Sequence, residues 1–248
     1  YIMDTVGAGI GGQVPLLENM PLHNEDGADF GHLYSPWWLY KEQLAGKLDF
    51  GRGYHIEFGG GRDMPGLFST AGIEWLTGGS YGAKFKEDQR RYYGSFMYFA
   101  GRGEMLPNEE SFCEIDPDMK DKWGIPVLRF HWKWSSHEIN QAAHMQKTFA
   151  ELIEAMGGRV RGTVQTDGRK AIAHGGEIIH EVGGAIMGDD PRTSVTDKWC
   201  QTWDVKNLFL TDGAPFPSNA DKNPTLTIMA NAWRVADHIL DRMRRKEL

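Results

Sequence analysis

The sequence has few cysteines, no long apolar run and no basic block except residues 242–246 at its end. Its two cysteines, Cys113 and Cys200, form no CxxC or metal-type spacing, so they leave the redox compartment open. No apolar run approaches the roughly 18 residues of a membrane span, and no basic-then-apolar signal opens the chain. The net charge of −7 argues against nucleic acid and anionic membranes as partners.

The composition is that of an ordinary globular protein. The chain has 248 residues, 40% hydrophobic and 25% charged, which is enough for one large domain or two small ones with a core. Its 31 glycines and 12% aromatic residues predict many tight turns around large, flat side chains. Because the first residue is Tyr1 and not Met, the N-terminus is processed or the sequence is part of something longer.

The clearest strand pattern covers residues 127–134, in which apolar and polar side chains alternate. This period of two predicts an antiparallel sheet with one covered face. Residues 92–100 form a short aromatic segment bounded by glycine, which predicts a second strand. Residues 1–73, rich in glycine, proline and aromatic residues, are interpreted as loops with short strands.

Two long helices are expected. Ser135 and Glu138 have capping-box spacing, and apolar residues then recur at helical intervals until Gly157, which predicts a helix packed on that sheet. Near the C-terminus, Asn223 suits an N-cap and Pro224 the first helical position. The apolar stripe of this second helix is Leu226, Met229, Trp233, Ala236 and Leu240.

Residues 7–12 read GAGIGG and match the GxGxxG fingerprint of dinucleotide-binding loops. The fingerprint requires a hydrophobic strand before the glycines and a helix after them. Here residues 1–6 are a poor strand, and Pro15 and Pro21 leave little room for a helix. The motif therefore predicts a glycine-rich turn.

A second cluster, His174, Glu177, His180 and Glu181, has residue types that bind metals. Two histidine ligands on one helix face need a spacing of four, whereas these are separated by six positions and flanked by paired glycines that break helices. The spacing therefore argues against a metal site. Taken alone, His180 would be a satisfied, partly buried histidine.

Four blocks of sequence around and after His180 change that interpretation. They are HEVGGAIMGDDP at 180–191, WDVKNL at 203–208, TDGAPFP at 211–217 and NPTLTIMA at 223–230. In this order they resemble the C-terminal signature of the glucose–methanol–choline (GMC) oxidoreductases, closest in wording to the gluconate dehydrogenase and glucoside 3-dehydrogenase branch. The dense likeness covers residues 178–239.

The resemblance implies an α/β fold with two parts. Residues 1–173 would form an α+β substrate-binding domain, an antiparallel sheet with packed helices. Residues 174–248 would form the C-terminal portion of a Rossmann-like FAD-binding domain, whose principal nucleotide-binding strand and loop are missing from this chain. Tyr1–Asp4 is similar to the segment that precedes the substrate domain in the family, with Thr5 where a histidine is often found.

The resemblance also assigns roles. It makes His180 the base that removes the hydroxyl proton during alcohol oxidation, with Asn223, at a position held by His or Asn, as its partner. It places Asp212 and Gly213 beside the ribityl–pyrophosphate part of FAD, although alone they would predict only a turn. Asn223 also retains a helix-capping interpretation.

The helix that follows Asn223 supplies further cofactor contacts. Its first residues are Pro224, Thr225 and Leu226, and the amides of the last two would favour negative charge at the N1–C2=O edge of reduced flavin.

Candidates for substrate contact are aromatic and basic. Trp37, Trp38 and Tyr54 could stack on a sugar ring, and Arg90 or Arg91 could hold an acid group. The alternatives are an aromatic core and a solvated arginine pair.

The implied activity is FAD-dependent oxidation of a CH–OH group of a sugar, glycoside or sugar acid, with hydride transfer to flavin N5. The branch favours a quinone, a cytochrome or a small subunit over oxygen as the electron acceptor, and a periplasmic location over a cytoplasmic one. One alternative is a non-catalytic fragment or subunit that binds no flavin alone. Another is a metal-dependent hydrolase that uses His174 and His180.

Overall fold

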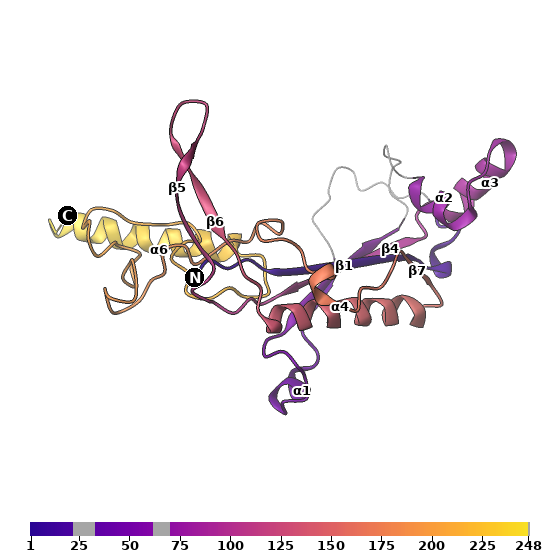
Figure 1. Ribbon diagram of the computed structural model, residues 1–248, viewed down its shortest axis with the longest axis horizontal. Helices are drawn as coiled ribbons and strands as arrows, with labels where there is room; N and C mark the ends of the chain where they lie inside the picture. Colours follow the sequence, from indigo (N-terminus) through magenta and orange to yellow (C-terminus); the bar gives the residue numbers. More distant parts are fainter. Residues whose placement is uncertain (22–32, 62–69, 248) are drawn as a thin grey trace. The chain divides into compact units, whose positions relative to one another are not determined.

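The computed structural model of the protein describes residues 1–21, 33–61 and 70–247 (Figure 1). Its elements in chain order are β1 (Val6–Gln13), a 3-10 turn (Pro15–Leu17), β2 (Leu33–Ser35), α1 (Tyr40–Leu44), β3 (Tyr54–Gly60), α2 (Ala71–Thr77), α3 (Gly82–Tyr92), β4 (Phe96–Gly103), β5 (Phe112–Lys120), β6 (Pro126–His131), α4 (Ser136–Ala155), β7 (Arg159–Arg161), α5 (Gly168–Ala171) and α6 (Thr225–Arg244).

The chain forms two compact units that are interleaved in the sequence. Unit 1 combines residues 1–6, 103–138 and 173–248, and unit 2 combines residues 7–102 and 139–172. The chain passes between the units four times, after residues 6, 102, 138 and 172. The assignment of residues 1–173 to substrate and 174–248 to FAD stays a prediction.

Unit 2 is built on a five-stranded sheet of order β2-β3-β4-β1-β7. The glycine motif at 7–12 is part of strand β1, so the expected glycine-rich turn was wrong. The glycines are needed for close packing across the two faces of this strand. A Cβ at Gly9 would collide with the ring of Tyr98, and a Cβ at Gly12 would lie 2.7 Å from the Ile153 side chain.

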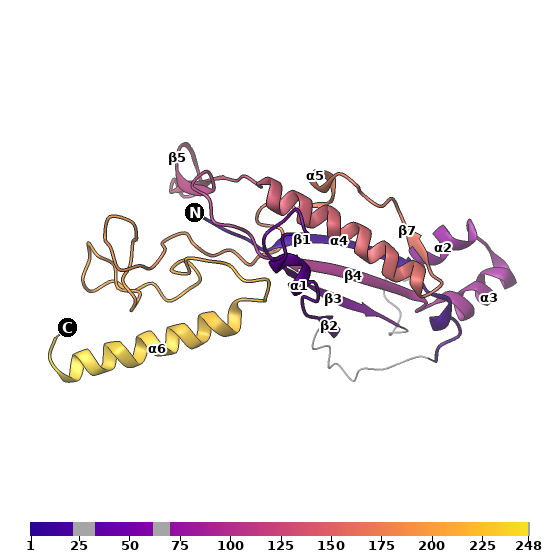
Figure 2. The same ribbon diagram turned by 90° about the horizontal axis from the view of Figure 1, so that it is seen from below.

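Helix α4 covers one face of this sheet, as Figures 1 and 2 show. Its residues Met145, Phe149 and Ile153 are fully buried. The ring of Phe149 stacks on Phe99 of β4 with 5.9 Å between centroids. The sheet under α4 is thus not the one expected from residues 127–134, and β4 begins at Phe96, after the end of α3, instead of at residue 92.

The start of α4 has the capping arrangement that its sequence predicts. The Ser135 hydroxyl donates to Glu138 Oε2 at 2.5 Å, and the Ser135 backbone N–H donates to the same oxygen at 2.7 Å. The His137 N–H donates to Ser135 Oγ at 3.2 Å. The capping box is confirmed, and it fixes where the helix begins.

Unit 1 contains the antiparallel β5–β6 ribbon and α6. The alternating residues of β6 do not form a covered face, because Leu128 and Phe130 are 56% and 57% exposed. Helix α6 exists as predicted, but its stripe is also open, with Leu226 79% and Trp233 74% exposed. The strand and the helix were predicted, whereas the covered face expected for residues 127–134 was wrong.

Within residues 1–21, 33–61 and 70–247, no helix combines the length and the apolar character that crossing a bilayer requires.

Candidate active site around His180

His180 is held by the first residues of the chain. Its ring Nδ1 lies 3.0 Å from the Thr5 hydroxyl, and its backbone N–H donates to Asp4 Oδ1 at 3.0 Å. Asp4 also accepts from the Thr5 N–H at 2.7 Å and the Gly176 N–H at 3.3 Å. Asp4 and Thr5 are fully buried, while His180 is half-buried. A buried carboxylate therefore ties three backbone amides together around one imidazole.

The backbone on each side of His180 is also constrained. Ile179 has φ +60°, a conformation that is strained for a β-branched residue. After His180, Val182 pairs with Met3 through two backbone hydrogen bonds of 2.9 and 3.0 Å. Strain of this kind persists only where neighbours over-determine the conformation, and the Asp4 and Met3 bonds do so here.

A second segment of unit 1 lies along the residues after His180. The N–H of Ala185 donates to Ala214 O at 3.0 Å, and the N–H of Met187 donates to Pro215 O at 2.8 Å. Gly213 fits tightly beneath this segment, because a Cβ there would lie 3.0 Å from Glu181 O and 3.2 Å from Val182 Cγ1. The TDGAPFP block is thereby joined to the HEVGG block.

Asp212 is exposed and makes a local turn. Its Oδ1 accepts the Ala214 N–H at 2.9 Å. The turn uses one oxygen of the carboxylate, so the turn and a cofactor contact are compatible. The role predicted for Asp212 stays a prediction.

Asn219 connects His180 to the pocket on which Asn223 lies. Its side-chain amide donates to the His180 carbonyl at 3.4 Å, and it is 2% exposed. It also lines a pocket of about 260 Å³ together with Phe216, Asn223, Pro224 and Thr227. His180 itself is not among the residues that line this pocket, so the pairing of His180 with Asn223 stays a prediction. Sequence reasoning gave Asn219 no role.

The start of α6 differs by one position from the prediction. The N-cap is Pro224 and the helix runs from Thr225, so Asn223 is not the N-cap and no side chain caps this end. Asn223, Thr225 and Leu226 are exposed. Helix capping therefore does not account for Asn223, since its carboxamide precedes the capping position.

Among the residues that the structure describes, no three His, Cys, Asp or Glu side chains form a group able to hold a metal ion. His174 is exposed, and its backbone N–H donates to Glu177 Oε2 at 2.8 Å. This hydrogen bond closes a local turn between His174 and Glu177.

The predicted aromatic substrate contacts belong to unit 2. The ring of Trp37 lies 4.9 Å from Tyr54, and Trp38 lies 5.6 Å from it. Tyr54 is fully buried, its hydroxyl is 2.8 Å from His144 Nδ1, and burial raises the pKa of Tyr54 above its ordinary value. A ring with no exposed face cannot stack on a sugar, so the prediction for Tyr54 is corrected to a core role. Trp38 is 42% exposed and stays a candidate.

Arg90 and Arg91 lie on the last turn of α3 and are exposed. Arg91 Nε donates to Glu18 Oε2 at 2.7 Å, and this bond raises the pKa of the Arg91 guanidinium. Arg91 thus already has a carboxylate partner within its own unit. This bond uses Nε, so a substrate acid group would have to share the guanidinium with Glu18.

Asp4 is the main residue that sequence reasoning missed. It lies 176 positions before His180, and only the likeness of Tyr1–Asp4 to a family segment pointed to this part of the chain. No local pattern connects two residues so far apart.

Residues 107–232 match the family model described as GMC oxidoreductase. The match spans the four sequence blocks and the pocket that Asn219 and Asn223 line. The chain belongs to the GMC oxidoreductase family.

Three curated relatives are similar over large parts of the chain. The 2-methyl-1,2-propanediol dehydrogenase of Mycolicibacterium austroafricanum is 34% identical over 86% of this chain and 37% of its own length. The fructose dehydrogenase large subunit of Gluconobacter japonicus is 33% identical over 71% and 31%. The gluconate 2-dehydrogenase flavoprotein of Pantoea cypripedii is 28% identical over 61% and 25%. The chain therefore spans between 25% and 37% of the lengths of these relatives.

Proposed function

We propose that this chain is the part of an FAD-dependent enzyme that oxidises a CH–OH group of a sugar, glycoside or sugar acid. His180 acts as the base and Asn223 as its partner. The observation that carries the proposal is the Thr5–His180 contact of 3.0 Å, backed by the buried Asp4 carboxylate. The names of relatives that act on fructose, gluconate and a diol support the choice of a hydroxyl substrate.

Thr5 and Asp4 suit His180 to this role. A histidine that donates its Nδ1–H to Thr5 Oγ1 keeps a lone pair on Nε2, and this lone pair takes the hydroxyl proton of the substrate. After that transfer the imidazolium still donates Nδ1–H to the same threonine oxygen. Asp4 holds the backbone of His180, so the ring needs little reorganisation to receive the proton.

Asn223 supplies a second polar group. Its side chain is exposed on the pocket that Asn219 lines, and Asn219 bonds the His180 carbonyl. A carboxamide N–H donates to the substrate oxygen as that oxygen loses its proton and gains negative charge. His180 and Asn223 together would orient one hydroxyl and stabilise its developing alkoxide.

The residues at the start of α6 fit FAD. The helix has 20 residues and no side-chain cap, so its first amides, at Thr225 and Leu226, favour a negatively charged group placed before them. Gly213 is buried against the backbone of Glu181 and Val182, and Asp212 is exposed beside it. When bound, FAD would supply the hydride acceptor, and Pro224 would set the entry to the helix.

For the substrate and the acceptor we propose a carbohydrate and a non-oxygen acceptor. Trp38 is the aromatic side chain among the predicted contacts with substantial exposed surface, at 42%. Both the fructose and the gluconate relative are named dehydrogenases, which supports an acceptor other than oxygen, and the name large subunit supports a further subunit as partner. The acceptor that we propose is a quinone, a cytochrome or a small subunit. A non-catalytic subunit without flavin is the alternative.

The test is purification of the protein at its natural length, followed by its absorbance spectrum and a panel of sugars, glycosides, sugar acids and diols with an artificial acceptor. The proposal predicts a bound flavin spectrum that bleaches without oxygen on addition of a carbohydrate. If only a simple diol bleaches the flavin, the proposed substrate is wrong and a diol takes the place of the carbohydrate. A colourless, folded protein would establish the non-catalytic alternative.

A further inference from the structure

The residues that lead to His180 are attached to the rest of unit 1 on two sides. On one side, Asp4 accepts the N–H groups of Gly176 and His180, at 3.3 and 3.0 Å. Asp4 is fully buried, and Gly176 has φ +85°, a conformation that favours glycine. On the other side lie Trp132 and Trp134, which precede α4. Both attachments act on the backbone before the imidazole, so both decide where the imidazole lies.

The ring of Trp132 lies directly on Gly175. A Cβ at position 175 would be 2.4 Å from Trp132 Cδ2 and 2.6 Å from its Cγ and Cε2. Ordinary contacts between carbon atoms are about 3.5–4.0 Å, so a methyl group there would push the indole or the backbone aside. Gly175 directly precedes Gly176, whose N–H bonds Asp4. Glycine at 175 therefore lets the indole and the carboxylate hold neighbouring residues.

Trp134 holds the residue two positions before Gly175. Its Nε1–H donates to the Ala173 carbonyl at 3.2 Å. The two indoles also contact each other edge to face, with 5.2 Å between their ring centroids. Trp134 thus fixes the start of the segment by a hydrogen bond, and Trp132 fixes its middle by packing.

The N–H groups of the two indoles differ. Trp134 Nε1 has the Ala173 carbonyl as its acceptor. Trp132 Nε1 is buried and has no acceptor among the residues that the structure describes. Trp132 therefore acts through its ring, and Trp134 acts through its N–H as well. Phenylalanine keeps a ring and removes the N–H, so the same substitution tests the two residues differently.

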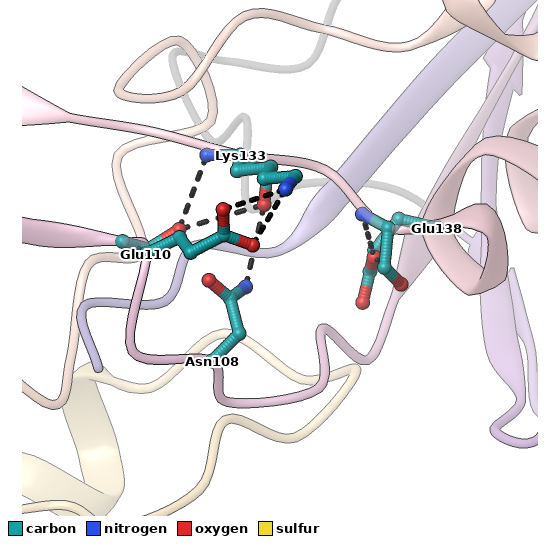
Figure 3. A network of polar contacts seen from close by, with 6 residues as sticks. Asn108, Glu110, Lys133 and Glu138 are labelled. Atoms are coloured by element: carbon teal, nitrogen blue, oxygen red, sulfur yellow. Dashed lines mark hydrogen bonds and ion pairs between the residues drawn. The ribbon is translucent and has the colours of Figure 1, made fainter.

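Lys133, the residue between the two indoles, is held by polar contacts of its own (Figure 3). Its N–H donates to Ser111 Oγ at 3.2 Å, and Asn108 Nδ2 donates to its carbonyl at 3.3 Å. The carbonyl of Ser111 accepts the Ile2 N–H at 2.7 Å, two residues before Asp4. The indoles and Asp4 are therefore joined to one framework within unit 1.

The segment between these attachments contains strain. Ile179, directly before His180, has φ +60°, and such a conformation persists only where contacts on several sides over-determine the backbone. Asp4 supplies contacts at the end of the segment, and the two indoles supply them at its start. If the start were released, the backbone would relax and the imidazole would leave the Thr5 hydroxyl, which is 3.0 Å from Nδ1.

We propose that Trp132 and Trp134 are positioning residues for His180. They fix the backbone of residues 173–176, and through it the orientation of the imidazole beside Thr5. This role rests on the proposed function of His180 as the base. A misplacement of about 1 Å costs about 100-fold in rate, so a small movement of this backbone is enough to lower turnover.

The first test is Gly175→Ala in the flavin-loaded protein at its natural length. The added methyl group displaces Gly176 from Asp4, and kcat is expected to fall about 10–100-fold with little change in KM. The pH profile of kcat/KM is expected to shift, because the imidazole leaves the Thr5 hydroxyl. Gly51→Ala is the control. It adds the same methyl group where nothing lies within 4 Å, and it is expected to keep wild-type values.

The second test replaces each tryptophan by phenylalanine. Trp134→Phe removes the N–H that bonds Ala173, and kcat is expected to fall about threefold to tenfold. Trp132→Phe keeps a ring over Gly175 and removes an N–H that has no acceptor in the described part of the chain. It is therefore expected to stay within about twofold of wild type. Equal losses in the two variants, or no loss in Trp134→Phe, overturn the proposal.

Hydrogen exchange gives a readout that does not depend on turnover. Protection of the Gly176 and His180 amides, which donate to Asp4, is expected to fall about tenfold in Gly175→Ala and to stay unchanged in Gly51→Ala. Unchanged protection in Gly175→Ala overturns the proposal. A wild-type kcat and pH profile in Gly175→Ala also overturn it when His180→Ala is inactive. Full turnover in His180→Ala instead overturns the proposed function, and with it any role in positioning a base.

Discussion

Helices α4 and α6 each have 20 residues and an apolar stripe at helical spacing, yet their surroundings differ. In α4, Met145, Phe149 and Ile153 are fully buried against the sheet of unit 2. In α6, Trp233 is 74% exposed, and Val235 is the buried residue of the helix. The comparison teaches that periodicity predicts a helix and its apolar side, but not the surface that covers that side.

The same contrast separates the two units. Unit 2 closes a core between α4 and its sheet, whereas unit 1 holds the His180 site and leaves α6 and the β5–β6 ribbon open. We therefore expect substitutions in unit 2 to change stability and substitutions near His180 to change turnover. The following experiments test this division.

The largest effect is expected for His180→Ala. Loss of the base lowers the turnover number by about 10²–10⁴-fold, while thermal unfolding changes little. Steady-state kinetics of the flavin-loaded protein check this. His174→Ala, an exposed histidine in the same segment, is the control and keeps its turnover. Equal loss in both variants would contradict a role specific to His180.

In unit 2, Phe149→Ala is expected to lower the free energy of unfolding by about 3–5 kcal/mol, because it leaves a cavity under α4. Denaturant unfolding measures the change. Leu152→Ala on the same helix is the matched control, since Leu152 is already 38% exposed and loses less. If Phe149→Ala lost turnover at a temperature at which it is still folded, the assignment of stability to unit 2 and of turnover to the His180 segment would be wrong.

Thr5→Val tests how His180 is held. The substitution keeps the shape and removes the hydroxyl 3.0 Å from Nδ1. Losing this bond is expected to lower kcat/KM by about tenfold. The pH profile of kcat/KM should shift as well, a change that a packing role would not produce. Thr5→Ser keeps the hydroxyl and should restore both values, and a Ser variant as impaired as Val would refute the role.

A smaller effect is expected at the start of α4. Ser135→Ala removes the hydroxyl that bonds Glu138 and the His137 amide, at a cost of about 1 kcal/mol in the free energy of unfolding. Ser136→Ala, the next residue, is the control and should change stability little. Chemical denaturation of both variants gives the comparison, and equal losses would remove the cap as the cause.

The smallest effect concerns pH. Burial lowers the pKa of His144, a residue of α4 whose ring Nδ1 lies 2.8 Å from the Tyr54 hydroxyl. The unfolded chain therefore binds this proton at a higher pH than the folded chain does. The stability that the neutral ring contributes is present above about pH 6.5 and is lost as pH falls through the folded pKa. Unfolding curves at a series of pH values check this, and His144→Gln should flatten the slope in this window.

Local patterns predicted the local structures. The capping box at Ser135 and the amphipathic spacing placed α4 within a residue or two, and Pro224 placed the start of α6 within one residue. The glycine motif at 7–12 was predicted as a turn because its glycines break isolated structure. In the protein they serve a strand that needs room for Tyr98 and Ile153.

The candidate site, too, was predicted from the sequence only in part. The four blocks pointed to His180 and Asn223 from the sequence, since each block is contiguous. Asp4 was missed because its partner is 176 positions away, and Tyr54 was misplaced because its ring is indistinguishable in sequence from an exposed one.

The sequence by itself determined the family, the helices and the residue types that carry the chemistry. These depend on neighbours within a few positions, where spacing and propensity act directly. Only the tertiary structure decided that Asp4 and Thr5 hold His180, that Tyr54 is core, and which apolar faces stay open. Burial and hydrogen bonding between distant segments depend on how the chain folds back on itself, which no local pattern encodes.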